Sequence, residues 1–70
     1  MKCNELQKKV YEGYYNLMSD EMREEIKTYT PLPKKVSLPP GADRESAIKI
    51  IFHNNSWLRV YLRKGSLEWY

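Results

Sequence analysis

The chain lacks most features of extracellular, metal-binding and membrane proteins. Its 70 residues include a single cysteine, Cys3, and a single histidine, His53. It can therefore form no internal disulfide and has no Cys/His group with the spacing of zinc ligands. No apolar run approaches the roughly 18 residues of a membrane span, and the first twenty residues are charged rather than signal-like. These absences predict a cytoplasmic protein with no metal site, no cofactor and no membrane contact.

Signatures of catalysis are also missing. His53 has no acidic or thiol neighbour that the sequence fixes, and Ser56 and Ser66 fall where turns are expected to place hydroxyls. Asp43 and Glu45 lie in an expected loop, where a paired-carboxylate site would be a coincidence. No glycine-rich phosphate loop is present. We therefore expect no enzymatic activity.

The composition is that of one small folded domain, residues 1–70, with 41% hydrophobic residues, 30% charged residues and nine aromatics. The formal net charge is +3 and is unevenly distributed, since residues 1–30 carry −1 and residues 31–70 carry +4. This basicity is mild compared with the dense basic stripes of typical nucleic-acid binders.

The N-terminal part is predicted to be helical over residues 4–29, as one bent helix or two short ones. Asn4 followed by Gln7 resembles a capping box, and Ser19 resembles a second N-cap followed by acidic residues. Two apolar stripes at helical spacing support this interpretation. Their members are Leu6, Val10, Tyr14, Leu17, Met18, Met22, Ile26 and Tyr29. Gly13 weakens the first segment, and close approach to another backbone is one possible reason.

A proline-rich connection is expected over residues 30–46, with residues 34–38 as a possible short edge segment. Residues 47–53 are rich in β-branched side chains and predict a strand, although a helix starting at Asp43 is the alternative. Turn residues at 54–56 and 64–65 then divide residues 47–70 into a three-stranded antiparallel meander. The predicted fold class is α+β, with the helical region packed on this meander.

Hairpin register decides which face of the meander is buried. A three-residue loop over 54–56 places Phe52 opposite Leu58, whereas a two-residue loop mixes charged and apolar residues on both faces. A two-residue turn at 64–65 places Leu62 opposite Leu67. Both turns agree on one apolar face, predicted to be the core: Ile48, Ile50, Phe52, Leu58, Val60, Leu62, Leu67 and Trp69.

The opposite face interleaves aromatic and basic side chains, and three interpretations apply to it. Such residues favour strands for structural reasons alone. Trp, Tyr and Arg are also enriched in protein-interface hot spots, and cations beside aromatics can bind phosphates and stack bases. The candidate partner-binding residues are Lys49, His53, Trp57, Arg59, Tyr61, Arg63 and Tyr70.

The function predicted from these features is a small non-catalytic binding protein that engages a partner protein through this face. Small stand-alone domains of this size are frequent among phage and mobile-element proteins that inhibit a host factor, and the analogy rests on size. The alternative is a nucleic-acid-binding module using the same face. Self-association through this face or through the free edge of the last strand is a further possibility.

Overall fold

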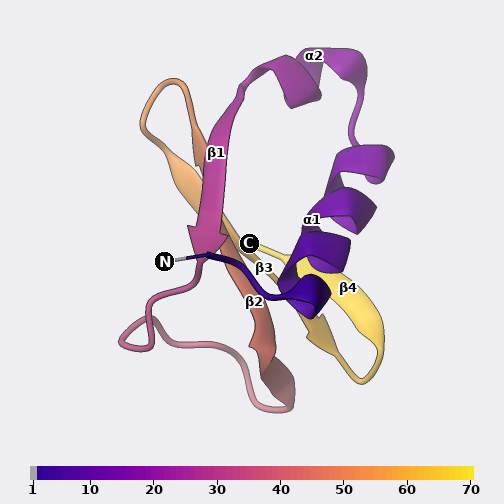
Figure 1. Ribbon diagram of the computed structural model, residues 1–70, viewed down its shortest axis with the longest axis vertical. Helices are drawn as coiled ribbons and strands as arrows, with labels where there is room; N and C mark the ends of the chain where they lie inside the picture. The colour runs from indigo at the N-terminus through magenta and orange to yellow at the C-terminus, as the bar shows by residue number, and fades with distance from the viewer. Residues whose placement is uncertain (1) are drawn as a thin grey trace.

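Two helices precede a four-stranded antiparallel sheet in the computed structural model, which describes residues 2–70 (Figure 1). The α+β class is confirmed, but the sheet has four strands rather than the three predicted. The strand order follows the chain, β1-β2-β3-β4. No helix of the described residues is long and apolar enough to cross a bilayer. The elements are α1 (Glu5–Leu17), α2 (Asp20–Glu24), β1 (Ile26–Pro31), β2 (Ala42–Phe52), β3 (Trp57–Arg63) and β4 (Ser66–Trp69).

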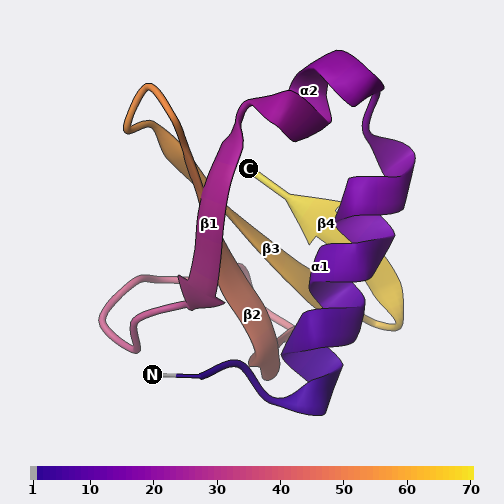
Figure 2. The same cartoon turned by 45° about the horizontal axis from the view of Figure 1, so that its top comes forward.

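Helix α1 begins with the predicted capping box. The Gln7 backbone N–H donates to Asn4 Oδ1 over 2.7 Å, and the Asn4 N–H donates to Gln7 Oε1 over 2.8 Å. At the other end the Tyr15 carbonyl accepts from the Met18 backbone N–H over 3.2 Å and from Arg23 Nε over 2.8 Å, so a cation lies beside the last turn. Figures 1 and 2 show α1 on one side of the sheet, with α2 bridging its end to the start of β1.

The helical region is shorter than predicted, because residues 26–31 form strand β1. Ser19 does cap α2, but that helix ends at Glu24. Ile26 and Tyr29 therefore lie on a strand, where Tyr29 stacks on Tyr11 with ring centroids 3.9 Å apart. The segment is rich in β-branched and aromatic residues, which favour a pleated surface. Pairing with β2 decides in favour of the strand.

Strand β2 begins at Ala42, five residues before the predicted start, so the alternative helix from Asp43 is wrong. Residues 34–38 form a turn and irregular backbone, and the suggested edge segment is also wrong. The segment that joins β1 to β2 is therefore residues 32–41, which we call the connection.

A bulge interrupts the pairing of β2 with β3. Asp43 lies opposite Leu62 while Ile48 lies opposite Val60, so four residues of β2 face one residue of β3. The Ser46 hydroxyl replaces a missing backbone partner within the bulge. It accepts from the Leu62 N–H over 2.8 Å and donates to the Asp43 carbonyl over 2.7 Å. Ser46 is fully buried.

The bulge also receives the start of α1. Gln7, itself buried, donates from Nε2 to the Ala47 carbonyl over 3.0 Å, and Asn4 Nδ2 donates to the Glu45 carbonyl over 3.3 Å. The same Ala47 carbonyl accepts from the Leu32 N–H over 3.1 Å. The Glu45 and Ala47 carbonyls thus anchor the start of α1, and the Ala47 carbonyl, which faces β1, also holds the end of that strand.

The β2–β3 hairpin has a three-residue loop, as predicted, but the loop is His53–Asn55 rather than residues 54–56. Phe52 pairs with Ser56 through a 2.9 Å hydrogen bond, and Asn55 takes a positive φ of 70°. A left-handed residue is usual in the last position of such loops. The register is therefore displaced by two residues, and Ile50 faces Leu58. Because the displacement is even, every side chain stays on its predicted face.

The β3–β4 hairpin has the predicted register, with Leu62 opposite Leu67 and Val60 opposite Trp69. Its two turn residues, Lys64 and Gly65, have φ values of 52° and 79°. Positive φ at both positions is the requirement of a type I′ turn.

The core lies between α1 and the predicted apolar face. Its buried members come from α1, β2 and β3: Val10, Tyr14, Ile48, Ile50, Phe52 and Val60. Leu58, Leu62 and Leu67 pack against them and are partly buried. Trp69 lies on this face, with its ring edge-on to Tyr14 at 5.3 Å, but it remains 39% exposed. Trp69 therefore lies on the predicted core face, but the prediction that it is buried there is wrong.

Gly13→Ala is expected to stabilise the protein by about 1 kcal/mol, because alanine favours a helix interior over glycine by that amount. A Cβ at this position would lie 3.4 Å from Leu67 Cδ2, an ordinary van der Waals contact. Urea denaturation of the two proteins measures the difference. A loss of stability would show that the α1–β4 contact cannot accommodate a methyl group.

Ser46→Ala is expected to destabilise the protein by about 1–3 kcal/mol, because it leaves the Leu62 N–H buried without an acceptor. Ser66→Ala, at an exposed position in β4, is the matched control and should change stability little. Equal midpoints for both variants in urea would contradict the role assigned to the Ser46 hydroxyl.

Candidate interaction surface

The sheet face opposite α1 is built from rows of side chains that cross the strands. In one row, Thr28 of β1 lies beside Ile51 of β2, which lies beside Trp57 of β3. In the next row the backbone pairings align four residues, Thr30, Lys49, Arg59 and Tyr70. The antiparallel register therefore places two cations and two aromatics in adjoining rows.

These cations and aromatics form one contact network, which we call the Trp57 cluster: Lys49, Trp57, Arg59 and Tyr70. Lys49 Nζ lies 4.7 Å from the Trp57 ring centroid, and Arg59 Cζ lies 5.0 Å from the same centroid. Arg59 Cζ is also 4.4 Å from the Tyr70 ring centroid. Each such contact contributes on the order of 0.5–1 kcal/mol at exposed sites. Trp57 is 38% exposed and Tyr70 is 55% exposed, so both rings remain accessible.

The Trp57 cluster carries uncompensated positive charge. Within residues 2–70, neither Lys49 nor Arg59 has a carboxylate within 4.0 Å. The two residues are direct cross-strand partners. The hydrogen-bond pattern of the ladder makes theirs a non-hydrogen-bonded pair, in which side chains approach most closely. Like charges directly opposite one another destabilise a sheet.

Arg59 also holds the connection against the sheet. Its Nη1 donates to the Ser37 carbonyl over 3.1 Å and lies 3.5 Å from the Tyr70 hydroxyl. Arg59 Nε is buried and has no hydrogen-bond partner among the described residues. The guanidinium is thus fixed in orientation by aromatic rings and one carbonyl, but it is not neutralised.

The connection covers the remainder of this face, and Tyr61 is therefore buried rather than exposed. Tyr61 is only 2% exposed, because it packs with residues of the connection and of β2: Leu32, Val36, Leu38, Ala42 and Ala47. The expectation that Tyr61 is displayed to a partner is therefore wrong. Val36 and Leu38 lie in the segment suggested as an edge strand, and they pack instead against a second small core.

Arg63 lies on the predicted face but is engaged within the protein. Its Nε lies 3.0 Å from Glu68 Oε1, and its Nη2 donates to Glu68 Oε2 over 3.1 Å. The Tyr61 hydroxyl donates to the same carboxylate over 3.3 Å. Tyr61 and Glu68 are direct cross-strand partners, and the sequence did not predict the neutralisation of Arg63. Arg63 therefore contributes less free charge than the sequence suggested.

The His53 side chain is exposed in the β2–β3 hairpin loop. The backbone N–H of this residue donates to the Glu25 carbonyl over 2.9 Å. Among residues 2–70, no three His, Cys, Asp or Glu side chains are grouped as metal ligands would be. Of the seven candidate residues, the structure therefore brings Lys49, Trp57, Arg59 and Tyr70 together. Sequence reasoning missed Thr28 and Thr30 as neighbours of the surface, because it assigned no strand to residues 26–31.

Comparison with known proteins adds no relative, since no family model, curated protein or solved structure matches this chain at a significant level.

In the Tyr61→Phe variant, the free energy of unfolding is expected to fall less steeply with rising alkaline pH than in the wild type. Burial, and then the Glu68 carboxylate, raise the pKa of Tyr61 above its ordinary value. Folding therefore disfavours the phenolate, so stability is intact below the unfolded pKa of about 10 and falls as the pH rises through the folded pKa. At neutral pH the variant should lose about 1 kcal/mol with the hydrogen bond to Glu68.

Urea denaturation from neutral pH to above about pH 10 measures both effects. Tyr15→Phe, which removes an exposed phenol, is the control. An alkaline profile of Tyr61→Phe that parallels the wild type would contradict this assignment.

Proposed function

We propose that this protein is a non-catalytic binding protein that docks an acidic surface of a partner protein on the Trp57 cluster. The observation that carries the proposal is the pair Lys49 and Arg59, which lie directly opposite each other and which, among residues 2–70, form no side-chain ion pair within 4.0 Å. Like charges directly opposite each other repel, and a partner's carboxylates would relieve this repulsion.

The residue types of the cluster support a protein interface. Trp, Tyr and Arg dominate hot spots, where a rigid aromatic anchor is surrounded by contacts that exclude water. Trp57 and Tyr70 supply exposed aromatic area, and the connection already restricts Arg59 through the Ser37 carbonyl. Binding would therefore freeze few further rotamers of this side chain, which lowers the entropic cost of association.

Nucleic acid is the second candidate, since the same side chains could contact phosphates and bases. The burial of Tyr61 and the pairing of Arg63 with Glu68 weaken this alternative. They leave Lys49 and Arg59 as the cations of the cluster, and the affinity of nucleic-acid binders grows with the number of phosphates neutralised. Docking of this kind would cover a functional surface of the partner protein. Such an effect agrees with the inhibitor-like role that the small size of the chain suggests.

The test compares wild type with Trp57→Ala and with Arg59→Ala in affinity capture from the native host, with one portion treated with nuclease. Captured proteins are then purified and titrated calorimetrically. We expect a nuclease-resistant partner whose affinity falls by at least about 2 kcal/mol, roughly 30-fold, in each variant. Leu17→Ala, which removes an exposed apolar side chain of α1 on the other side of the sheet, is the control and should bind like the wild type.

Two outcomes would contradict a protein partner on this surface. If nuclease removes the bound material and the affinity falls steeply with salt, the ligand is nucleic acid. If Trp57→Ala and Arg59→Ala bind as tightly as the wild type, the Trp57 cluster is structural and not a binding surface.

A further inference from the structure

The two edges of the sheet differ in how they are protected. In β1, Thr28 and Thr30 direct their backbone groups toward β2, so the outward groups belong to Tyr29 and Pro31. Pro31 has no N–H and interrupts the row of donors, a common protection of edge strands. The register near Lys27 is also irregular. The β1 edge is therefore a poor template for another strand.

The β4 edge has no such protection. Tyr70 and Arg59 exchange both backbone hydrogen bonds, at 3.0 and 3.1 Å, which sets the alternation along β4. Glu68 consequently points its backbone groups toward β3, while those of Leu67 and Trp69 point away from the sheet. Within residues 2–70 nothing pairs with these outward groups. Two donors and two acceptors are thus presented in line.

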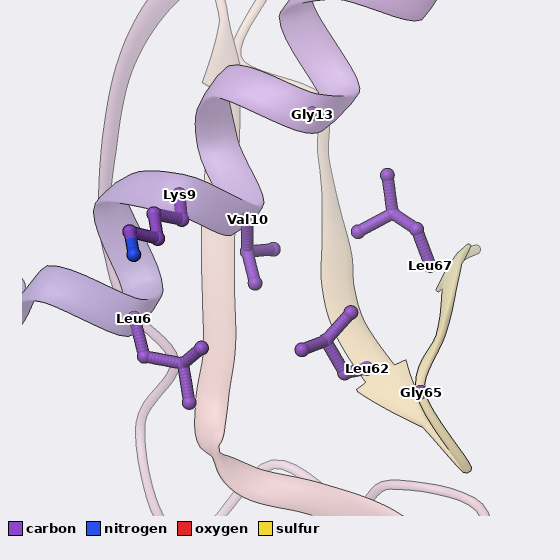
Figure 3. A pocket seen from close by; sticks show the side chains of 7 residues that line it. All are labelled: Leu6, Lys9, Val10, Gly13, Leu62, Gly65 and Leu67. Atoms are coloured by element: carbon purple, nitrogen blue, oxygen red, sulfur yellow. The ribbon is translucent and has the colours of Figure 1, made fainter.

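Beside this edge lies an apolar hollow of about 320 Å³ between α1 and the β3–β4 hairpin (Figure 3). Leu6 and Val10 line it from α1, and Leu62 and Leu67 line it from the sheet. Trp69, on the same side of the sheet, is 39% exposed although its ring touches Tyr14. The edge therefore combines free backbone groups with incompletely covered apolar surface.

We propose that β4 pairs with β4 of a second copy of this chain, antiparallel and across a two-fold axis at Glu68. In this register Leu67 of one copy faces Trp69 of the other, so all four outward groups of each strand find partners. The indole of the second copy's Trp69 then lies next to Leu67, on the side of the hollow. A single self-complementary strand satisfies a two-fold interface, the commonest form of homo-oligomer.

Charge does not prevent this pairing. The two Glu68 side chains face each other across the axis, but each carboxylate is bound by Arg63 of its own chain at 3.0 Å. The inference does not rest on the proposed partner-binding role. It is argued from backbone groups of β4 and from the hollow on the α1 side, whereas the side chains of the Trp57 cluster lie on the other face of the sheet. The resulting eight-stranded sheet would present two such clusters, which would increase the avidity for a multivalent partner.

The test removes one donor while keeping every side chain. The 70-residue chain is made by chemical synthesis with an N-methyl group on Leu67, whose N–H takes no part in the intramolecular ladder. N-methylation of Tyr29, at the β1 edge, is the matched control. In sedimentation equilibrium we expect the wild type and the Tyr29 variant to rise from 8.4 kDa toward twice that mass with concentration. The Leu67 variant should stay monomeric.

A second measurement keeps the proposal testable if N-methylation impairs folding. In the unmodified protein, dilution should shift the amide resonances of Leu67 and Trp69, and isotope-filtered spectra of mixed labelled and unlabelled copies should show contacts between these residues. A wild type that is monomeric at submillimolar concentration overturns the proposal. So does dimerisation that survives methylation of Leu67, or contacts that map to another surface.

Discussion

The bulge in β2, closed by the buried hydroxyl of Ser46, is the constraint on which the other elements depend. It offsets the two parts of β2 relative to β3, and Ser46 supplies the acceptor that the Leu62 N–H would otherwise lack. The carbonyls of Glu45 and Ala47 are turned to the cap of α1 and to the end of β1. The irregular part of β2 thus receives the start of α1, next to the point where β1 ends and the connection begins.

The route of the connection divides the outer sheet face into two parts with different roles. Over one part, Leu32, Val36 and Leu38 cover Tyr61 and form a second small core. Over the other part, Trp57 and Tyr70 remain exposed beside two cations. Arg59 lies at the boundary, since its guanidinium holds the connection through Ser37 and also belongs to the exposed cluster.

The alternation of apolar and polar residues was the most informative signal for the sequence-based predictions, because the side chains of a strand change face with every residue. The core face was predicted although the β2–β3 register was displaced by two residues, since an even displacement preserves the face. Strand β1 was missed because Ile26 and Tyr29 also fit a helical stripe, and in a six-residue segment periodicity alone does not separate the two. Of the seven candidate residues, Trp57, Arg59, Lys49 and Tyr70 cluster, whereas Tyr61 is buried, Arg63 is paired with Glu68 and His53 lies in the hairpin loop.

Four features could be read from the chain alone: the α+β class, the capping box at Asn4, the Lys64-Gly65 turn and the division of residues 47–70 into two faces. Each of these follows from local chemistry, either hydrogen bonds within four residues, left-handed backbone at a turn, or the alternation of apolar side chains. Three features became visible only in the folded protein: residues 26–31 form a strand, the connection buries Tyr61, and Glu68 neutralises Arg63. These outcomes depend on contacts between segments that adjoin only after folding, and such contacts leave no periodic signal along the chain.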